Sequence, residues 1–216
     1  MQEFVWVTGM ILKQTALGEY DRRICLLTKE KGKISAFAKG ARKPGSRLAA
    51  ATNPFSFGCF KLYAGRSSYT VSEADIQNYF EDLMKDYVGA YYGMYFAEVA
   101  DYYTRENNDE RQMLKLLYQS LRALCAPALP NQLIKCIYEL KAIAVNGEFP
   151  GVPAGIELSE SAVYALQYIA ASSVEKLYTF TVSDTVLKEL QAVADVYRKR
   201  FMEHEFKSLE ILKTLC

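Results

Sequence analysis

The spacing of apolar residues changes near Asn78, and this change constrains the fold more than any other feature of the sequence. Before it, β-branched and aromatic residues form short runs separated by turn residues, as in strands. After it, apolar residues recur every three or four positions, as on one face of a helix. Strand-like runs followed by helical runs are typical of an α+β protein. We therefore expect a β domain over residues 1–78 and an all-α helical domain over residues 79–216.

The first part predicts five strands of a small antiparallel barrel. The runs are VWVTGMILK, DRRICLLT, KISAFAK, FSFGCFKLY and SYTVSEADI, with turns that include Gly18, KEKG and AGRSS. A five-stranded OB-fold barrel, a fold that binds nucleic acids, fits these runs. An SH3-like barrel fits them almost as well, and the spacing alone leaves both open.

The second part predicts a bundle of helices. A buried stripe with a four-residue spacing is formed by Leu83, Tyr87, Tyr91, Tyr95, Val99 and Tyr103. Asn108 or Asp109 is expected to cap the second helix, and the third is expected to begin beside Pro130 and end at Gly147. Ser159 and Ser183 are the expected caps of two later helices. SLEILKTL is expected to form a short last helix.

The net charge of +1 is unevenly distributed along the chain. Residues 1–78 contain 12 Lys and Arg against 6 Asp and Glu, a net charge of +6, whereas residues 79–216 contain 14 against 19, a net charge of −5. A basic domain joined to a mildly acidic one indicates that the first domain meets a polyanion.

The stretch FAKGARKPGSRLAAATNPF concentrates this positive charge. Lys39, Arg42, Lys43 and Arg47 lie there on a Gly- and Pro-containing loop without a carboxylate, where they could contact phosphates or simply be solvated. Further cations that could extend the patch are Lys13, Arg22, Arg23, Lys33, Lys61 and Arg66. Aromatic residues that could stack on bases, or belong to the barrel core, are Trp6, Phe57, Phe60, Tyr63 and Tyr69.

The sequence contains little that indicates catalysis. It has one histidine, His204, and none of the motifs HExxH, GxxxxGK[ST], GxGxxG or GxSxG. Its five cysteines form no CxxC pair, and we interpret them as buried, reduced thiols of a cytoplasmic protein. No apolar stretch is long enough to cross a bilayer. A binding protein is therefore favoured over an enzyme, with no metal and no cofactor.

The run ILKQTALGEYDRRICLLTKEKGKISAFAKGARKPGSRLAAATNPFSFGCFKLYAGRSSY closely resembles the N-terminal domain of the RecO family, the bacterial recombination mediators of DNA repair. The matching features, in order, are the ILK end of the first strand, GExDRxxxLLT, AKGAR, the pair Pro54 and Phe55, and GR before the fifth strand. CIYELKAIAVNGEFPG and HEFKSLEIL are similar to later family motifs. The resemblance covers the whole chain and is strongest up to about Tyr69.

The resemblance implies an OB-fold domain followed by a helical domain, and a role without bond-breaking chemistry. Members of the family bind single- and double-stranded DNA, anneal complementary strands and, with RecR, load RecA onto DNA coated by single-stranded DNA-binding protein. Many carry a four-cysteine zinc module, but residues 147–172 contain no cysteine, so we expect that segment to be held by packing. The implied location is the bacterial cytoplasm, at the nucleoid.

Two binding surfaces follow as hypotheses. The DNA face is expected to consist of Arg22, Arg23, Lys39, Arg42, Lys43 and Arg47. The resemblance also implies that the acidic, apolar-ended tail of single-stranded DNA-binding protein docks on the helical domain, which requires an apolar groove edged by cations. The candidates are Arg122, Ile134, Lys135, Ile137 and Tyr138, although apolar residues on a helix stripe are usually core. The alternative functions are an RNA-binding OB-fold protein and a non-catalytic interaction scaffold.

Overall fold

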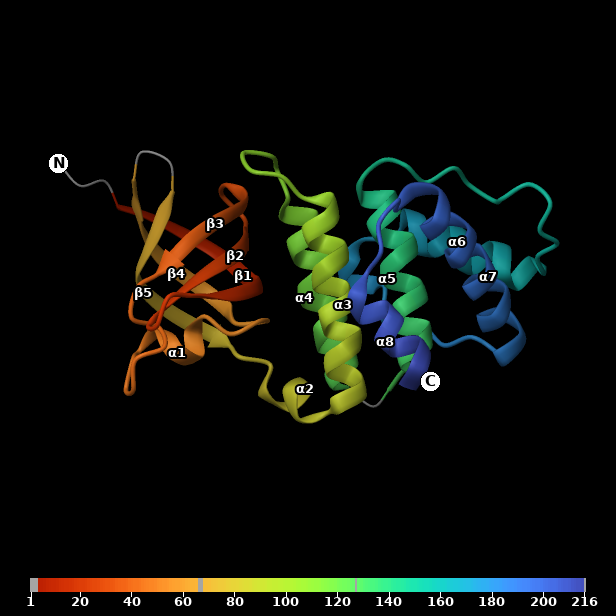
Figure 1. Ribbon diagram of the computed structural model, residues 1–216. Helices are drawn as coiled ribbons and strands as arrows, with labels where there is room; N and C mark the ends of the chain where they lie inside the picture. The colour runs from red at the N-terminus through yellow and green to blue at the C-terminus, as the bar shows by residue number, and fades with distance from the viewer. Residues whose placement is uncertain (1–3, 66–67, 127, 216) are drawn as a thin grey trace. The chain divides into compact units, whose positions relative to one another are not determined.

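The computed structural model describes residues 4–65, 68–126 and 128–215 (Figure 1). Five strands form its first part: β1 (Phe4–Leu17), β2 (Asp21–Thr28), β3 (Gly32–Ala38), β4 (Phe57–Ala64) and β5 (Tyr69–Asn78). A short helix, α1 (Leu48–Ala51), lies between β3 and β4. All five predicted strands are present. Arg66, which we expected to extend the basic patch, lies outside the described residues.

The strands form a closed barrel in the order β1-β2-β3-β5-β4, with β4 returning to β1. Every pairing is antiparallel except that of β3 with β5, which is parallel and closes the barrel through the pairs Ala36–Tyr69 and Phe37–Thr70. A five-stranded barrel closed in this way is an OB-fold. The structure thus confirms the predicted α+β class and OB-fold barrel, and it rules out the SH3-like alternative.

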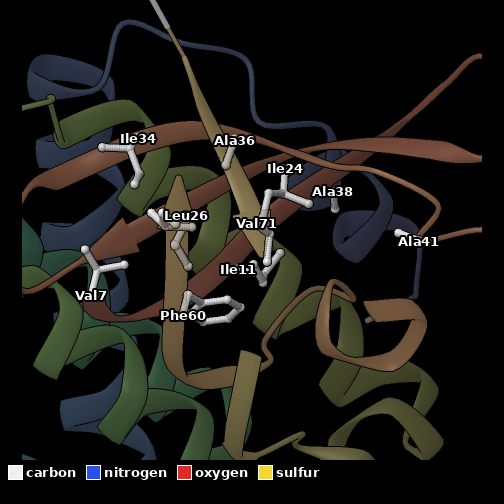
Figure 2. Close-up of a cluster of buried hydrophobic side chains, with 11 residues drawn as sticks. Val7, Ile11, Ile24, Leu26, Ile34, Ala36, Ala38, Ala41, Phe60 and Val71 are labelled. Atoms are coloured by element: carbon white, nitrogen blue, oxygen red, sulfur yellow. The ribbon is translucent and has the colours of Figure 1, made fainter. Parts of the chain in front are cut away.

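Alternate strand residues fill the barrel, as Figure 2 shows. On β2, Ile24 and Leu26 point inward and are at most 1% exposed, and they pack with Ile11, Phe60 and Val71 from β1, β4 and β5. Because successive side chains of a strand point to opposite faces, the residues between them face outward. Phe60 is therefore a core residue, and the expectation that it could stack on bases is wrong.

The turn between β2 and β3 is fastened to the segment that follows helix α3 (Tyr87–Tyr103). Gly32 lies at this turn with a φ of +65°, and a β-carbon there would collide with the carbonyl of Arg105. The backbone N–H of Lys33 donates to that carbonyl at 3.0 Å, and the N–H of Asn107 donates to Lys31 O at 2.9 Å. A glycine is required at this position, and the backbone hydrogen bonds fix the end of α3 against the barrel.

The remaining helices are α2 (Glu81–Lys85), α4 (Arg111–Cys125), α5 (Asn131–Val145), α6 (Glu160–Ala171), α7 (Asp184–Phe201) and α8 (Lys207–Leu215), with a 3₁₀ turn at Val174–Lys176. Two of the predicted caps are confirmed: Ser159 Oγ accepts from the N–H of Ala162, and Ser183 Oγ accepts from that of Val186. The cap expected at Asn108 or Asp109 stays a prediction; Asp109 Oδ1 accepts from the N–H of Arg111, the first residue of α4. Helix α5 follows Pro130 and ends before Gly147, whose φ is +75°. SLEILKTL lies in α8.

The predicted four-residue stripe is only partly buried. Tyr95 and Val99 are fully buried, but Tyr87 is 61% exposed, and α2 and α3 separate at Asp86. A helix has 3.6 residues per turn, so each four-residue step rotates the side chain by about 40° around the axis. The stripe therefore winds away from the core, and the expectation of burial is wrong for Tyr87.

The chain forms two compact units. The barrel unit comprises Met1–Lys85 and Ala97–Leu114, and the helical unit comprises Asp86–Phe96 and Lys115–Cys216. The part of α3 from Ala97 onward thus belongs with the barrel. The domain boundary between Asn78 and Tyr79 stays a prediction, although the strands end at Asn78 and the first helix begins at Glu81.

A buried carboxylate joins three helices of the helical unit. Glu139 on α5 is fully buried and accepts a short hydrogen bond from the hydroxyl of Tyr95 on α3. Lys135 Nζ lies 3.1 Å from its Oε2, and Arg198 Nε on α7 lies 3.6 Å from its Oε1. Burial and the Glu139 charge both raise the pKa of Tyr95, so the phenol stays protonated and donates.

The segment expected to replace a zinc module is held by side chains from α7. The hydroxyl of Tyr197 donates to Gly151 O at 2.6 Å, and the Tyr197 ring contacts Phe149 edge to face. Glu189 accepts from the backbone N–H and the hydroxyl of Ser159. Among the described residues, no group of three or more His, Cys, Asp or Glu could hold a metal ion.

The structure describes four of the five cysteines, and Cys216 lies outside the described residues. Cys25 and Cys136 are buried and Cys59 is half-buried, but Cys125 at the end of α4 is exposed, so the expectation of burial is wrong for Cys125. Within the described part of the chain, no helix combines the length and the apolar character needed to span a membrane.

The Glu139 network predicts a large cost for neutralising one side chain. We expect Glu139→Gln to lower the free energy of unfolding by about 3 kcal/mol, because it leaves the Lys135 and Arg198 cations without their buried counter-charge. The matched control is Glu157→Gln at an exposed position, which should change it by less than about 0.5 kcal/mol. Urea denaturation measures both variants, and equal effects would contradict the assignment.

Candidate nucleic-acid interface

The outer face of β2 and β3 gathers polar and basic side chains. Arg23 pairs with Phe37, and Cys25 pairs with Ser35, so these four positions face outward side by side. Arg23 and Ser35 are exposed and Phe37 is half-buried. The same alternation that fills the barrel with Ile24 and Leu26 therefore builds this outer surface.

A β-bulge adds Lys13 to this face. The register of β1 against β2 shifts between Ile11, which pairs with Leu26, and Lys13, which pairs with Cys25. Leu12 is the extra residue, and if it took an ordinary strand position Lys13 would fall on the same inward side as Ile11. The bulge thus keeps Ile11 in the core and places the lysine outside.

These residues line a cleft of about 970 Å³ in the barrel unit. Its walls come from β1, β2 and β3, from the end of β4 and the start of β5, and from the end of α3 and the segment after it. The lining includes Lys13, Thr15, Arg23, Cys25, Lys33, Ser35, Phe37, Gly65, Ser68, Tyr69, Asp101 and Glu106. OB-folds bind oligonucleotides on the face of strands 2 and 3 with the adjoining loops, and this cleft occupies that position.

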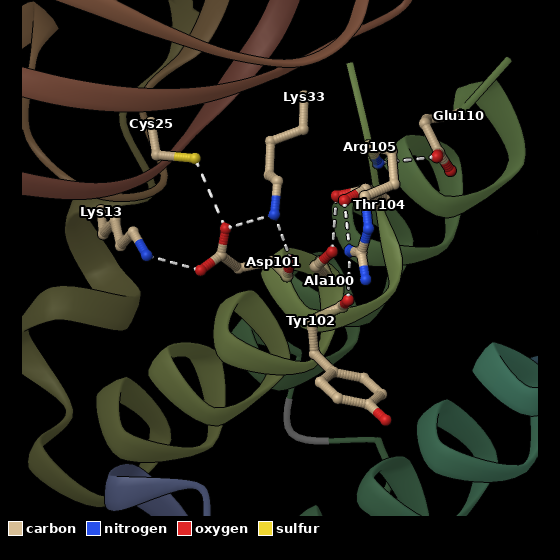
Figure 3. A network of polar contacts seen from close by, with 9 residues as sticks. All are labelled: Lys13, Cys25, Lys33, Ala100, Asp101, Tyr102, Thr104, Arg105 and Glu110. Carbon is tan, nitrogen blue, oxygen red and sulfur yellow. Dashed lines mark hydrogen bonds and ion pairs between the residues drawn. The ribbon is translucent and has the colours of Figure 1, made fainter. Parts of the chain in front are cut away.

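Asp101 of α3 lies between the two lysines of the cleft, as Figure 3 shows. Lys13 Nζ is 2.6 Å from its Oδ2, and Lys33 Nζ is 2.9 Å from its Oδ1. Lys33 Nζ also donates a short hydrogen bond to the backbone carbonyl of Asp101. Although burial opposes ionisation of Asp101, the two lysines outweigh it and lower the pKa of the carboxyl. The site therefore holds two cations and one carboxylate.

The thiol of Cys25 contacts the same carboxylate. Its Sγ lies 3.5 Å from Asp101 Oδ1. Burial, reinforced by the Asp101 charge, raises the pKa of Cys25 to about 12. The sulfur therefore stays a neutral thiol at physiological pH and is no nucleophile.

All four cations of the basic loop are exposed. Arg42 Nη1 donates to Gly18 O at 3.0 Å, and Lys43 Nζ lies 5.5 Å from the centre of the Tyr20 ring, so the loop packs on the β1–β2 turn. Among the described residues, none of the four loop cations forms an ion pair with a carboxylate. Lys39 follows directly after β3, two residues beyond Phe37, which lines the cleft, so the loop begins beside the cleft.

Arg22 and Arg23 have different surroundings, although the sequence placed both on the DNA face. Arg22 shares the inward alternation of Ile24, and its Nη1 donates to Ala49 O at 2.6 Å, Thr52 Oγ1 at 2.8 Å and Asn53 Oδ1 at 3.1 Å. These acceptors belong to α1 and the residues after it. Arg22 thus holds this segment to the barrel, and its part in DNA binding stays a prediction.

The predicted partner-binding residues lie mostly in the core of the helical unit. Ile134, Ile137 and Tyr138 are fully buried, and the hydroxyl of Tyr138 donates to Phe96 O at 2.7 Å. Lys135 is paired with Glu139, whereas Arg122 on α4 is exposed. The structure does not bring these residues together as an open groove, and their role in partner binding stays a prediction.

A groove of about 930 Å³ in the helical unit was not foreseen. Tyr164, which is 71% exposed, stacks on Tyr168, and Phe180 contacts Tyr168 edge to face. Among its described lining residues, the one charged side chain is Glu160. The groove thus offers aromatic rings to the apolar end of such a tail, but none of its described lining residues supplies the cation that the acidic part needs.

The aromatic candidates divide between two faces of the barrel. Tyr69 lines the cleft. Trp6, which is 56% exposed, lies elsewhere, on the outer face of β1 and β4, where Lys61 Nζ is 5.7 Å from its ring and 5.2 Å from that of Phe4. Sequence reasoning missed Phe37 and Asp101. The alternation of KISAFAK placed Phe37 on the face of Lys33, but nothing in the sequence placed Asp101 against the barrel.

Comparison with known protein families finds two matches. Residues 1–80 match the family model "Recombination protein O N terminal", and residues 84–152 match "Recombination protein O C terminal". The chain is 29% identical to the DNA repair protein RecO of Acetivibrio thermocellus over 98% of this chain and 97% of that protein. It is 27% identical to the protein of the same name from Clostridium novyi, over 96% of this chain and 93% of that protein.

The different surroundings of Arg22 and Arg23 predict different effects on stability. We expect Arg22→Ala to lower the free energy of unfolding by about 2 kcal/mol, because it removes charge-assisted hydrogen bonds to three acceptors. Arg23→Ala, at an exposed position, should change it by less than about 0.5 kcal/mol. Urea denaturation measures the free energy of unfolding of both variants. Equal losses would show that Arg22 does not fasten the α1 segment.

Proposed function

The chain belongs to the RecO family and has a recombination-mediator role in DNA repair, and we propose that it fills this role by binding single- and double-stranded DNA and annealing complementary strands. The observation that carries the proposal is the cleft on the OB-fold's binding face, joined to a loop of four exposed cations. The role needs no bond-breaking chemistry, so the protein acts as a binding protein and not as an enzyme.

In the proposed complex, one strand lies along the outer face of β2 and β3. The guanidinium of Arg23 and the loop cations contact phosphates, and the rings of Phe37 and Tyr69 offer surfaces on which bases stack. None of these contacts reads a base edge, so binding is independent of sequence. This suits a protein that must act on any damaged region.

Annealing requires two polyanions to approach each other. Cations that neutralise phosphates lower the repulsion between strands and release condensed counterions. The loop carries Lys39, Arg42, Lys43 and Arg47 without carboxylate partners among the described residues, so it can neutralise phosphates of a second strand as well as those of the strand in the cleft. The two surfaces together supply the geometry for annealing.

The same proposal includes protein partners. With RecR, the protein loads RecA onto DNA coated by single-stranded DNA-binding protein, and the tail of that protein docks on the helical unit at the bacterial nucleoid. Arg122 is the exposed cation among the residues predicted for this contact. Charge complementarity to an acidic tail supports its assignment.

The loop is tested by replacing Lys39, Arg42, Lys43 and Arg47 with Ala. We expect slower annealing of complementary strands coated by single-stranded DNA-binding protein. The slope of log affinity for single-stranded DNA against log salt should decrease by up to about 2.8, since each phosphate contact contributes about 0.7. A control variant with Ala at the exposed Lys85, Lys176, Lys188 and Lys213 has the same net charge. Unchanged annealing and salt slope in the loop variant would contradict the proposal, and preference for structured RNA would favour the alternative function.

Tail binding is tested at Arg122 and not at Lys135, because Lys135→Glu would place a second carboxylate beside the buried Glu139. We expect Arg122→Glu to weaken binding of a peptide of the tail sequence about tenfold, as loss of one charge-assisted contact does. The control is Lys188→Glu, which makes the same kind of charge change at an exposed position on a different helix, α7. Equal affinity of the two variants would remove Arg122 from the tail site.

A further inference from the structure

The cleft contains a carboxylate at the place where a phosphate would be expected. Both oxygens of Asp101 are occupied by cations of the cleft, Oδ2 by Lys13 at 2.6 Å and Oδ1 by Lys33 at 2.9 Å (Figure 3). Asp101 and both lysines line the cleft. The carboxylate therefore occupies, from within the protein, the position that an anionic ligand would take.

The two lysines are held differently. The side chain of Lys33 is 21% exposed, and it also donates to the backbone carbonyl of Asp101, so it has a partner that no substitution of the carboxylate removes. The side chain of Lys13 is 63% exposed, and among the described residues its one ion-pair partner is Asp101. Lys13 is thus the cation that loss of the carboxylate would free most completely.

A polyanion can displace the Asp101 carboxylate from Lys13 and Lys33, but a small anion cannot. Ion pairs near the surface contribute little net stability, so replacing the carboxylate by a phosphate costs little and gains little by itself. A DNA strand adds contacts to Arg23 and the loop cations, and these favour its binding. A single phosphate has no such additional contacts.

We infer that Asp101 is a built-in competitor for phosphate, which sets the affinity of the cleft and restricts it to ligands with several linked phosphates. This inference rests on the proposed function, because it takes DNA to occupy the cleft. It differs from a purely structural role, in which the carboxylate only fastens α3 to the barrel and its loss could not strengthen binding.

The test is the affinity of fluorescent oligothymidylate for Asp101→Asn over a range of salt concentrations. We expect binding about tenfold tighter at low salt, and a salt slope steeper by about 0.7 if Lys13 alone contacts phosphate and by about 1.4 if both lysines do. Glu106→Gln is the matched control, because Glu106 lines the same cleft but, among the described residues, forms no ion pair with either lysine. Unchanged or weaker binding by Asp101→Asn, or an equal gain by Glu106→Gln, overturns the inference.

Lys13→Ala in the parent protein keeps the test decisive if Asp101→Asn is unstable, and the double variant completes the cycle if it is stable. Competition predicts that Lys13→Ala reduces the salt slope by clearly less than 0.7 in the parent protein and by about 0.7 in the Asp101→Asn background. A full loss of about 0.7 in the parent protein shows that Asp101 does not compete. Arg23→Ala in the same assay separates the two claims: if it binds like the parent protein, the proposed function at the cleft fails, and if it binds less tightly, the inference stands or falls on Asp101 alone.

Discussion

The parallel pairing of β3 with β5 closes the barrel, and the rest of the barrel unit depends on this closure. A closed barrel has one inside, so every strand residue is assigned to the core or to the outer surface. With Ile24 and Leu26 inside, Arg23 and Cys25 must face out, and the register against β3 then brings Phe37 and Ser35 beside them. The candidate interface is a consequence of how the core is filled.

Two departures from regular structure adapt this surface to its proposed role. The bulge at Leu12 turns Lys13 outward, and Gly32 allows the segment after α3 to approach the β2–β3 turn, which fixes Asp101 over the strands. Without the first, the cleft would lose a cation. Without the second, α3 would not be held where its carboxylate meets both lysines.

The strands and the serine caps could be predicted because each depends on local alternation or on one side chain near a backbone N–H. Alternation alone left the OB-fold and the SH3-like barrel open, because the pairing of β3 with β5 that distinguishes them is not local. The different surroundings of Arg22 and Arg23 were also within reach, since neighbouring strand residues point to opposite faces. The position of Asp101 was not, because it is 88 residues from Lys13 and depends on packing between elements. The burial of Ile134 and Tyr138 shows the same limit: a helix stripe looks alike whether it forms a core or a groove.

The central claim is that single-stranded DNA lies on the outer face of β2 and β3 and on the loop from Lys39 to Arg47. Hydrogen exchange of backbone amides with and without saturating oligothymidylate tests it most directly, because it locates the ligand without altering the protein. The account predicts that oligothymidylate slows exchange in the loop, whose amides lie outside the barrel's hydrogen-bond ladder, and at the end of β4 and the start of β5. Slower exchange confined to the helical unit, with the loop unchanged, would contradict it.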